Sequence, residues 1–126
     1  KKNTFQILLL HFKKYKNMQI INLTPHPINL RVGDLETIFP KGDSIARVDS
    51  LSVETDLVIA GAIVSSTQFG EVSGLPVQQD GIFYIVSGLV LSALKGTRTD
   101  CIAPKTDMTA IRNDAGHIVA VTGWVM

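Results

Sequence analysis

The run Ile82–Val86 (IFYIV) most constrains what this chain can fold into. Its consecutive apolar β-formers predict a central strand that is buried on both faces. Ser87 follows in the position of a helix N-cap, and Gly88–Lys95 carries its apolar residues on one helical face. Lys95 suits the negative end of that helix, and Gly96 can take the left-handed position beyond it. The sequence therefore predicts a buried strand followed directly by one short helix.

Short strands joined by turns are predicted before this run. The two prolines of Thr24-Pro25-His26-Pro27 forbid a helix and push Thr24 and His26 into extended geometry. Apolar and polar residues then alternate with the period of a half-buried strand. The strands predicted here are Met18–Leu23, Ile28–Val32, Leu35–Phe39 and Ser44–Val48, with turns at Gly33-Asp34 and Pro40–Asp43.

Further strands are predicted on both sides of the central run. Leu57–Ser66 is apolar and its glycine is predicted to separate two short strands, whereas Gly70–Gly81 has the composition of a loop. Thr109–Asn113 and His117–Val125 flank the turn Asp114-Ala115-Gly116, so a hairpin is predicted to close the chain.

The chain has 126 residues, which is enough for one hydrophobic core and too few for two ordinary domains. A hydrophobic content of 45% and a charged content of 18% are typical of a globular protein. We therefore expect residues 18–126 to form a single globular domain of the α+β class. Its core would be a β-rich, mostly antiparallel sheet, or a barrel-like form of it, with one short helix after the central strand.

Charge is distributed unevenly along the chain. Residues 1–17 contain five lysines and no acid, whereas the rest contains 7 Lys and Arg against 11 Asp and Glu, so its net charge is 7 − 11 = −4. Such a body is a poor partner for a nucleic acid polymer or an anionic membrane. Phe5–Phe12 is too short to span a bilayer, and no small-residue cleavage site follows it. We expect residues 1–17 to be a non-native or alternative-start extension, as a loose helix, with the natural start at Met18.

Motifs for catalysis and metal binding are missing from the sequence. There is no G-x-S-x-G, no phosphate-binding glycine loop, and no Cys or His pair at metal-ligand spacing. Cys101 and His26 could form a thiol dyad only if the fold brought them together. The single cysteine is more simply a small buried hydrophobe in a protein of a reducing compartment. We therefore expect no enzyme, metal or cofactor, and a location in the cytoplasm.

Polar residues at strand ends are the remaining candidates for a ligand site. Arg98 and Asp100 face the same side of an extended segment, where they form either a salt bridge or a grip on a phosphate or carboxylate. His26 either caps neighbouring backbone or donates to a ligand, and Arg112 is either a solvated hairpin residue or a second anion donor. The helix start at Ser87 offers free backbone N–H groups. The predicted ligand-binding residues are Thr24, His26, Tyr84, Ser87, Arg98, Asp100 and Arg112, with Trp124 as an alternative aromatic surface.

Motifs spread from Met18 to Val125 resemble a family of small proteins from phages, prophages and bacteria. They are NLTPH (Asn22–His26), the ARV strand (Ala46–Val48), GLP…GIFYIVS (Gly74–Ser87), R-T-D (from Arg98) and IRNDAGHIVAV (ending at Val121). Val77-Gln78 departs from the usual second proline pattern, and IRNDAG replaces VRDxxG. The resemblance favours Met18 as the start and implies no catalytic residues.

Three functions are compatible with these observations. The first is a phage-encoded protein that sequesters a nucleotide-derived immune signal, such as a cyclic nucleotide or a cyclic ADP-ribose-like molecule, in the general style of phage sponge proteins. The second is a protein-interaction inhibitor of a host defence enzyme, and the third is a virion or assembly component. The apolar runs Leu57–Ser66 and Ile82–Val86 exceed what a small monomer comfortably buries, so a homo-oligomer is expected.

Overall fold

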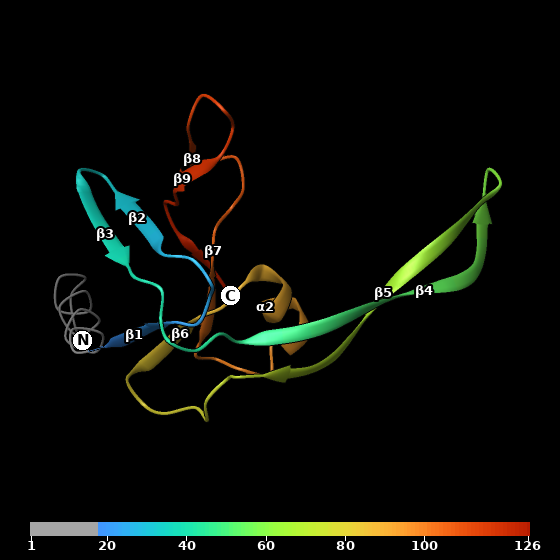
Figure 1. Cartoon of the computed structure of the whole chain (residues 1–126), viewed down its shortest axis with the longest axis horizontal. Coiled ribbons are helices and arrows are strands. Elements are labelled where there is room, and N and C mark those ends of the chain that lie inside the picture. The colour runs from blue at the N-terminus through green and yellow to red at the C-terminus, as the bar shows by residue number, and fades with distance from the viewer. Residues whose placement is uncertain (1–17) are drawn as a thin grey trace, which may run out of the picture.

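A four-stranded sheet forms the centre of the computed structural model, which describes residues 18–126 (Figure 1). The extension expected at residues 1–17 lies outside the described residues. The strand order is β1-β6-β7-β10, with β6 and β7 between the two edge strands. β1 (Gln19–Asn22), β6 (Ile82–Ile85) and β7 (Cys101–Pro104) run parallel, and β10 (Trp124–Val125) pairs antiparallel with β7.

Three antiparallel hairpins extend from this sheet. They are β2 (Ile28–Val32) with β3 (Leu35–Phe39), β4 (Arg47–Ile59) with β5 (Ala62–Ser73), and β8 (Ile111–Arg112) with β9 (Ile118–Ala120). The prediction of a β-rich, mostly antiparallel α+β protein is confirmed, in its open-sheet rather than its barrel-like form. No helix described in residues 18–126 is long and apolar enough to cross a membrane.

The short helix α2 (Gly88–Leu94) connects β6 to β7, as the sequence predicts. The Ser87 hydroxyl accepts a hydrogen bond from the Val90 backbone N–H at 3.2 Å, which is the N-cap bond. The helix ends one residue earlier than predicted. Lys95 itself takes the left-handed conformation, with φ 52°, and its N–H bonds to the Ser92 carbonyl. Gly96 follows with φ 74°, so the prediction of a left-handed glycine beyond the helix is confirmed, with Lys95 left-handed as well.

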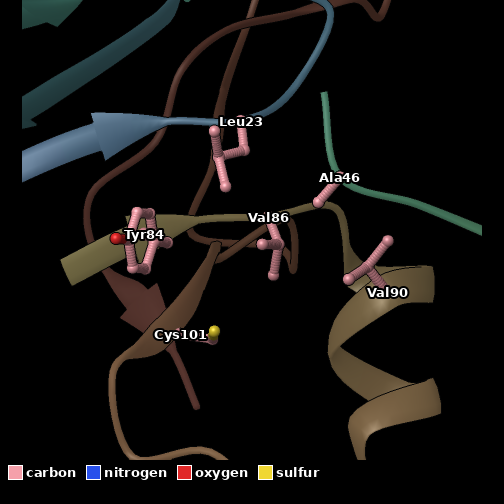
Figure 2. Close-up of a cluster of buried hydrophobic side chains, with 6 residues drawn as sticks. All are labelled: Leu23, Ala46, Tyr84, Val86, Val90 and Cys101. Atoms are coloured by element: carbon pink, nitrogen blue, oxygen red, sulfur yellow. The ribbon is translucent and has the colours of Figure 1, made fainter. Parts of the chain in front are cut away.

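Both faces of the sheet are covered, which explains the unbroken apolar run at β6. Tyr84 and Val86 belong to one cluster and Ile85 to the other, because successive side chains of a strand point to opposite faces. The first cluster packs under α2 and the start of β4, and Figure 2 shows its buried members, Leu23, Ala46, Tyr84, Val86, Val90 and Cys101. The second lies under the β2–β3 hairpin, and its buried members are Ile28, Ile85 and Val121. The prediction of a central strand buried on both faces is confirmed.

The middle of the chain differs from the prediction. Gly61 does separate two strands within Leu57–Ser66, as predicted, but these are the distal ends of the long strands of one hairpin rather than short strands. Ala60 (φ 51°) and Gly61 (φ 83°) form its two-residue turn, in the conformation that suits tight hairpins. Pairing continues to Ser73, so the loop predicted at Gly70–Gly81 begins only after that residue. The strand predicted at Ser44–Val48 likewise begins at Arg47.

Candidate functional site

Arg98 and Asp100 form a salt bridge at the amino end of β7. The Arg98 guanidinium donates from Nε and Nη2 to the two carboxylate oxygens of Asp100, each at 2.8 Å. Nη2 also donates to the carbonyl oxygen of Pro76 at 2.8 Å, which ties the loop after the β4–β5 hairpin to the sheet. The Asp100 side chain is 4% exposed and that of Arg98 is 19% exposed. Of the two predicted roles, the geometry therefore favours the structural ion pair.

The charges at this pair follow from its geometry. The hydrogen bond from Arg98 lowers the pKa of Asp100 in spite of its burial, and the same bond raises the pKa of Arg98. The neighbouring Cys101 thiol is fully buried and contacts an Asp100 oxygen at 3.5 Å. Burial first, and then the Asp100 charge, raise the pKa of Cys101 to about 11. The thiol is thus protonated at neutral pH, and the prediction of a small buried hydrophobe is confirmed.

Thr24 and His26 lie in a turn organised by Asn22, a residue that the sequence analysis does not single out. The Asn22 Nδ2 group donates to the carbonyl oxygens of His26 (2.9 Å) and Phe39 (3.1 Å). Its Oδ1 atom accepts from the backbone N–H of Thr24 at 2.9 Å and from the Thr24 hydroxyl at 2.7 Å. An Asn three positions before the first proline of a strand break, as Asn22 is before Pro25, is the signal of such a side-chain turn. His26 takes part through its backbone, and the residue is exposed.

The remaining predicted site residues have structural partners as well. Tyr84 is 2% exposed, with its ring in the first core cluster (Figure 2). Arg112 donates from Nη1 to the Gly116 carbonyl at 2.8 Å and so closes the β8–β9 turn. Trp124 packs edge-on against Phe39, with ring centroids 5.4 Å apart.

The parallel strands separate the predicted set into distant parts. Thr24 and Ser87 follow the carboxyl ends of β1 and β6, whereas Arg98 and Asp100 precede the amino end of β7. The structure brings Tyr84 and Asp100 together, since the Tyr84 N–H donates to the Asp100 carbonyl at 2.8 Å. Arg112 lies on a separate hairpin. The seven residues therefore do not converge on one site.

The β4–β5 hairpin, which we call the arm (residues 47–73), carries a group of exposed large hydrophobic residues, namely Leu51, Leu57, Val58, Ile59 and Ile63. Its base is anchored, because Val48 and Val72 pack against the first core cluster and α2 contacts both strands. Beyond the base it projects away from the sheet to a free tip (Figure 1). Leu51 is 64% exposed and Ile59 is 60% exposed. An isolated two-stranded ribbon is at best marginally stable in water, so these side chains need cover.

The two faces of the arm differ in charge. Residues directly opposite in an antiparallel pair share a face, and the register pairs Val53 with Ser66 and Ile59 with Ala62. A bulge between Glu54 and Val58 adds two residues to β4, so residues 55–57 stand opposite Val64 alone and belong to neither face by register. The face without charge, called the uncharged face below, carries Leu51, Val53, Ile59, Ala62, Val64, Ser66 and Gln68. The other, the acidic face, carries Ser50, Ser52, Glu54, Val58, Ile63, Ser65, Thr67 and Phe69.

A hollow beside β9 is a separate candidate. Its volume is about 480 Å³, and its lining is mostly apolar, with Asn29 and Thr106 as polar members. The other lining residues are Pro27, Ile28, Pro104 and the run 118–121, so the hollow is formed by residues outside the predicted set. Among residues 18–126, no group of three or more His, Cys, Asp or Glu side chains is placed to hold a metal ion.

Comparisons with known proteins add no assignment, since no family model, curated protein or solved structure matches this chain.

Proposed function

We propose that this chain is a non-catalytic assembly protein that joins other protein subunits through its arm, in the cytoplasm of a bacterial host cell. The observation that carries the proposal is the uncharged, apolar face of a long hairpin whose base is packed into the core and whose outer part has no cover within residues 18–126. A protein keeps such a surface when another protein covers it.

The placement of the polar residues supports the same proposal. Arg98, Asp100, Thr24 and Arg112 hold turns and loops in place through internal hydrogen bonds. Their role is then to fix the body from which the arm extends. A rigid base matters because it reduces the conformational entropy that the arm loses when it binds.

Native mass spectrometry of the protein purified from cells that express it naturally tests this function. The expected result is a complex of defined protein stoichiometry, which is lost in Leu51→Glu and kept in Ser52→Glu. The two positions are neighbours on β4 and point to opposite faces. A complex that survives Leu51→Glu, or a monomer whose sole companion is a small molecule, would contradict the proposal. A complex with a host defence enzyme would indicate that the protein is an inhibitor rather than an assembly component.

A second candidate function is that of a phage-encoded protein that sequesters a nucleotide-derived immune signal of its host. The hollow beside β9 is the observation that favours this function. Its volume of about 480 Å³ lies within the range of small-molecule sites, which is roughly 300–1,000 Å³. Calorimetry against cyclic nucleotides and ADP-ribose cyclisation products tests it. Binding that is weakened by Asn29→Ala, at the hollow, would support this function. If none of the compounds gives a heat of binding, this candidate function is ruled out.

A further inference from the structure

The uncharged face of the arm points to a specific partner. We propose that it binds the same face of a second copy of this chain, with the two arms antiparallel about a two-fold axis. This inference rests on the proposed function and names the first subunit that the arm recognises.

Charge favours a second copy as the occupant. No side chain of the uncharged face is ionised, whereas Glu54 lies on the acidic face and Asp56 stands in the bulge. Residues 18–126 have net charge −4, so two copies repel each other through most of their surfaces. Packing the two uncharged faces together buries none of the charged side chains that the register places, and it turns the Glu54 carboxylate of each arm outward. The desolvation cost that usually opposes pairing of like-charged proteins is therefore avoided.

The dimensions of the arm also fit a pair. The face runs from Gln68 to Ala62 on β5, and six steps at a rise of about 3.4 Å per residue make it roughly 20 Å long. Its seven side chains offer roughly 400 Å² in each copy, so a pair buries about 800 Å², the size of a weak and transient interface. The expected complex is therefore a dimer with a Kd on the order of micromolar.

An antiparallel arrangement covers both apolar ends of the face. The two-fold axis passes near the middle of the face, next to Ser66, and sets the Leu51 end of one arm against the Ile59 end of its partner. The two bodies then lie at opposite ends of the paired arms, where they do not collide. The four strands form a small two-layer sandwich, which supplies the second layer that a two-stranded ribbon lacks.

Sedimentation velocity of the full chain from about 1 to 200 μM, bracketing the expected affinity, tests the pairing. The wild type should shift from monomer to dimer across this range. Leu51→Glu should weaken dimerisation by at least about 100-fold, because the two-fold axis buries the new charge twice. Ser52→Glu should dimerise as the wild type does, since its charge joins the acidic face. Circular dichroism of both variants checks that the fold is retained.

Crosslinking provides a readout that does not depend on disrupting the arm. Ser66→Cys lies near the proposed axis and should form a covalent dimer with a short bismaleimide. Ser65→Cys, one residue away on the acidic face, should not. The native Cys101 is fully buried and stays unmodified.

The outcomes separate this inference from the proposed function. A monomer at every concentration, or equal crosslinking of the two cysteine variants, would overturn pairing with a second copy. The proposed function would survive that result if a different protein bound the arm and Leu51→Glu abolished its binding. A dimer that is lost in Leu51→Glu alone, together with crosslinking at Ser66→Cys alone, would establish the pairing.

Discussion

Replacing Arg98 with methionine removes the cationic partner of an almost fully buried carboxylate while keeping the aliphatic bulk of the side chain. The Asp100 carboxylate loses both 2.8 Å hydrogen bonds, and the Pro76 carbonyl loses its donor. Breaking a fully buried ion pair costs roughly 3–5 kcal/mol. The Arg98 side chain is 19% exposed, so water can reach part of the orphaned carboxylate. We therefore expect a loss of about 2–3 kcal/mol at pH 7, below the fully buried range.

The loss should also depend on pH. The pKa of Asp100 lies below its ordinary value in the folded wild type, because the ionised form accepts hydrogen bonds from Arg98. The stability that this pair contributes is therefore complete above the unfolded pKa and disappears as the pH falls through the folded pKa. In Arg98→Met the pKa of the buried Asp100 rises instead, so the carboxyl becomes neutral at low pH. The difference between wild type and variant should then shrink as the pH falls from the raised folded pKa of Asp100 in the variant toward its lowered folded pKa in the wild type.

Urea unfolding at pH 7 and pH 3 measures both effects, and the slope of each transition checks that the folded and unfolded states are comparable. Arg112→Met is the matched control. Its guanidinium is exposed and makes one hydrogen bond, to the Gly116 carbonyl, so a loss of under about 1 kcal/mol that does not vary with pH is expected. A loss below about 0.5 kcal/mol for Arg98→Met, or an equal loss at both pH values, would refute the assignment of Arg98 as a structural ion-pair partner.

Two further substitutions test the packing around the sheet. In urea unfolding, Asn22→Ala should cost about 2–4 kcal/mol, because it leaves buried backbone groups without partners. Asn29→Ala removes one exposed hydrogen bond and should cost under about 1 kcal/mol. Gly74→Ala should cost at least about 2 kcal/mol of unfolding free energy, because the new Cβ would lie 2.4 Å from the Ile45 carbonyl oxygen at a φ of +78°. Gly61→Ala is the control: it is also at positive φ but has open space around it, so it should cost about 1 kcal/mol. Equal losses for the two variants would refute the clash.

Local signals explain the parts of the fold that the sequence predicts correctly. The run at Ile82–Val86 and the Ser87 cap each depend on neighbours within a few residues, and both are found as predicted. Parallel pairing of β1 with β6 joins residues about 60 positions apart, as in Gln19 with Ile82. No turn connects such strands, so hairpin signals cannot reveal them. The central sheet therefore contains parallel pairs that a reading of turns and alternation does not indicate.

The candidate site could be predicted less well, for a related physical reason. Polar residues at strand ends are the natural partners for backbone groups that the sheet leaves unpaired. The same donors and acceptors would suit a ligand, so Thr24 and Arg98 have the same sequence pattern in either role. The role is decided by whether a backbone carbonyl, such as that of Pro76, lies within hydrogen-bonding distance. That depends on the tertiary structure, which the local sequence does not reveal.

In the arm, the interface proposed above has the same alternation of apolar and polar residues as an ordinary core strand. From Ser50 to Glu54 the apolar residues Leu51 and Val53 alternate with polar ones, as in any strand that covers a core. In this fold the strand leaves the body at Val48, so no part of residues 18–126 lies beneath the apolar face. Alternation specifies that one face is to be buried, and it does not specify by which chain. The pattern continues for several residues past the last core contact, and this is the reason for proposing that a second molecule covers the face.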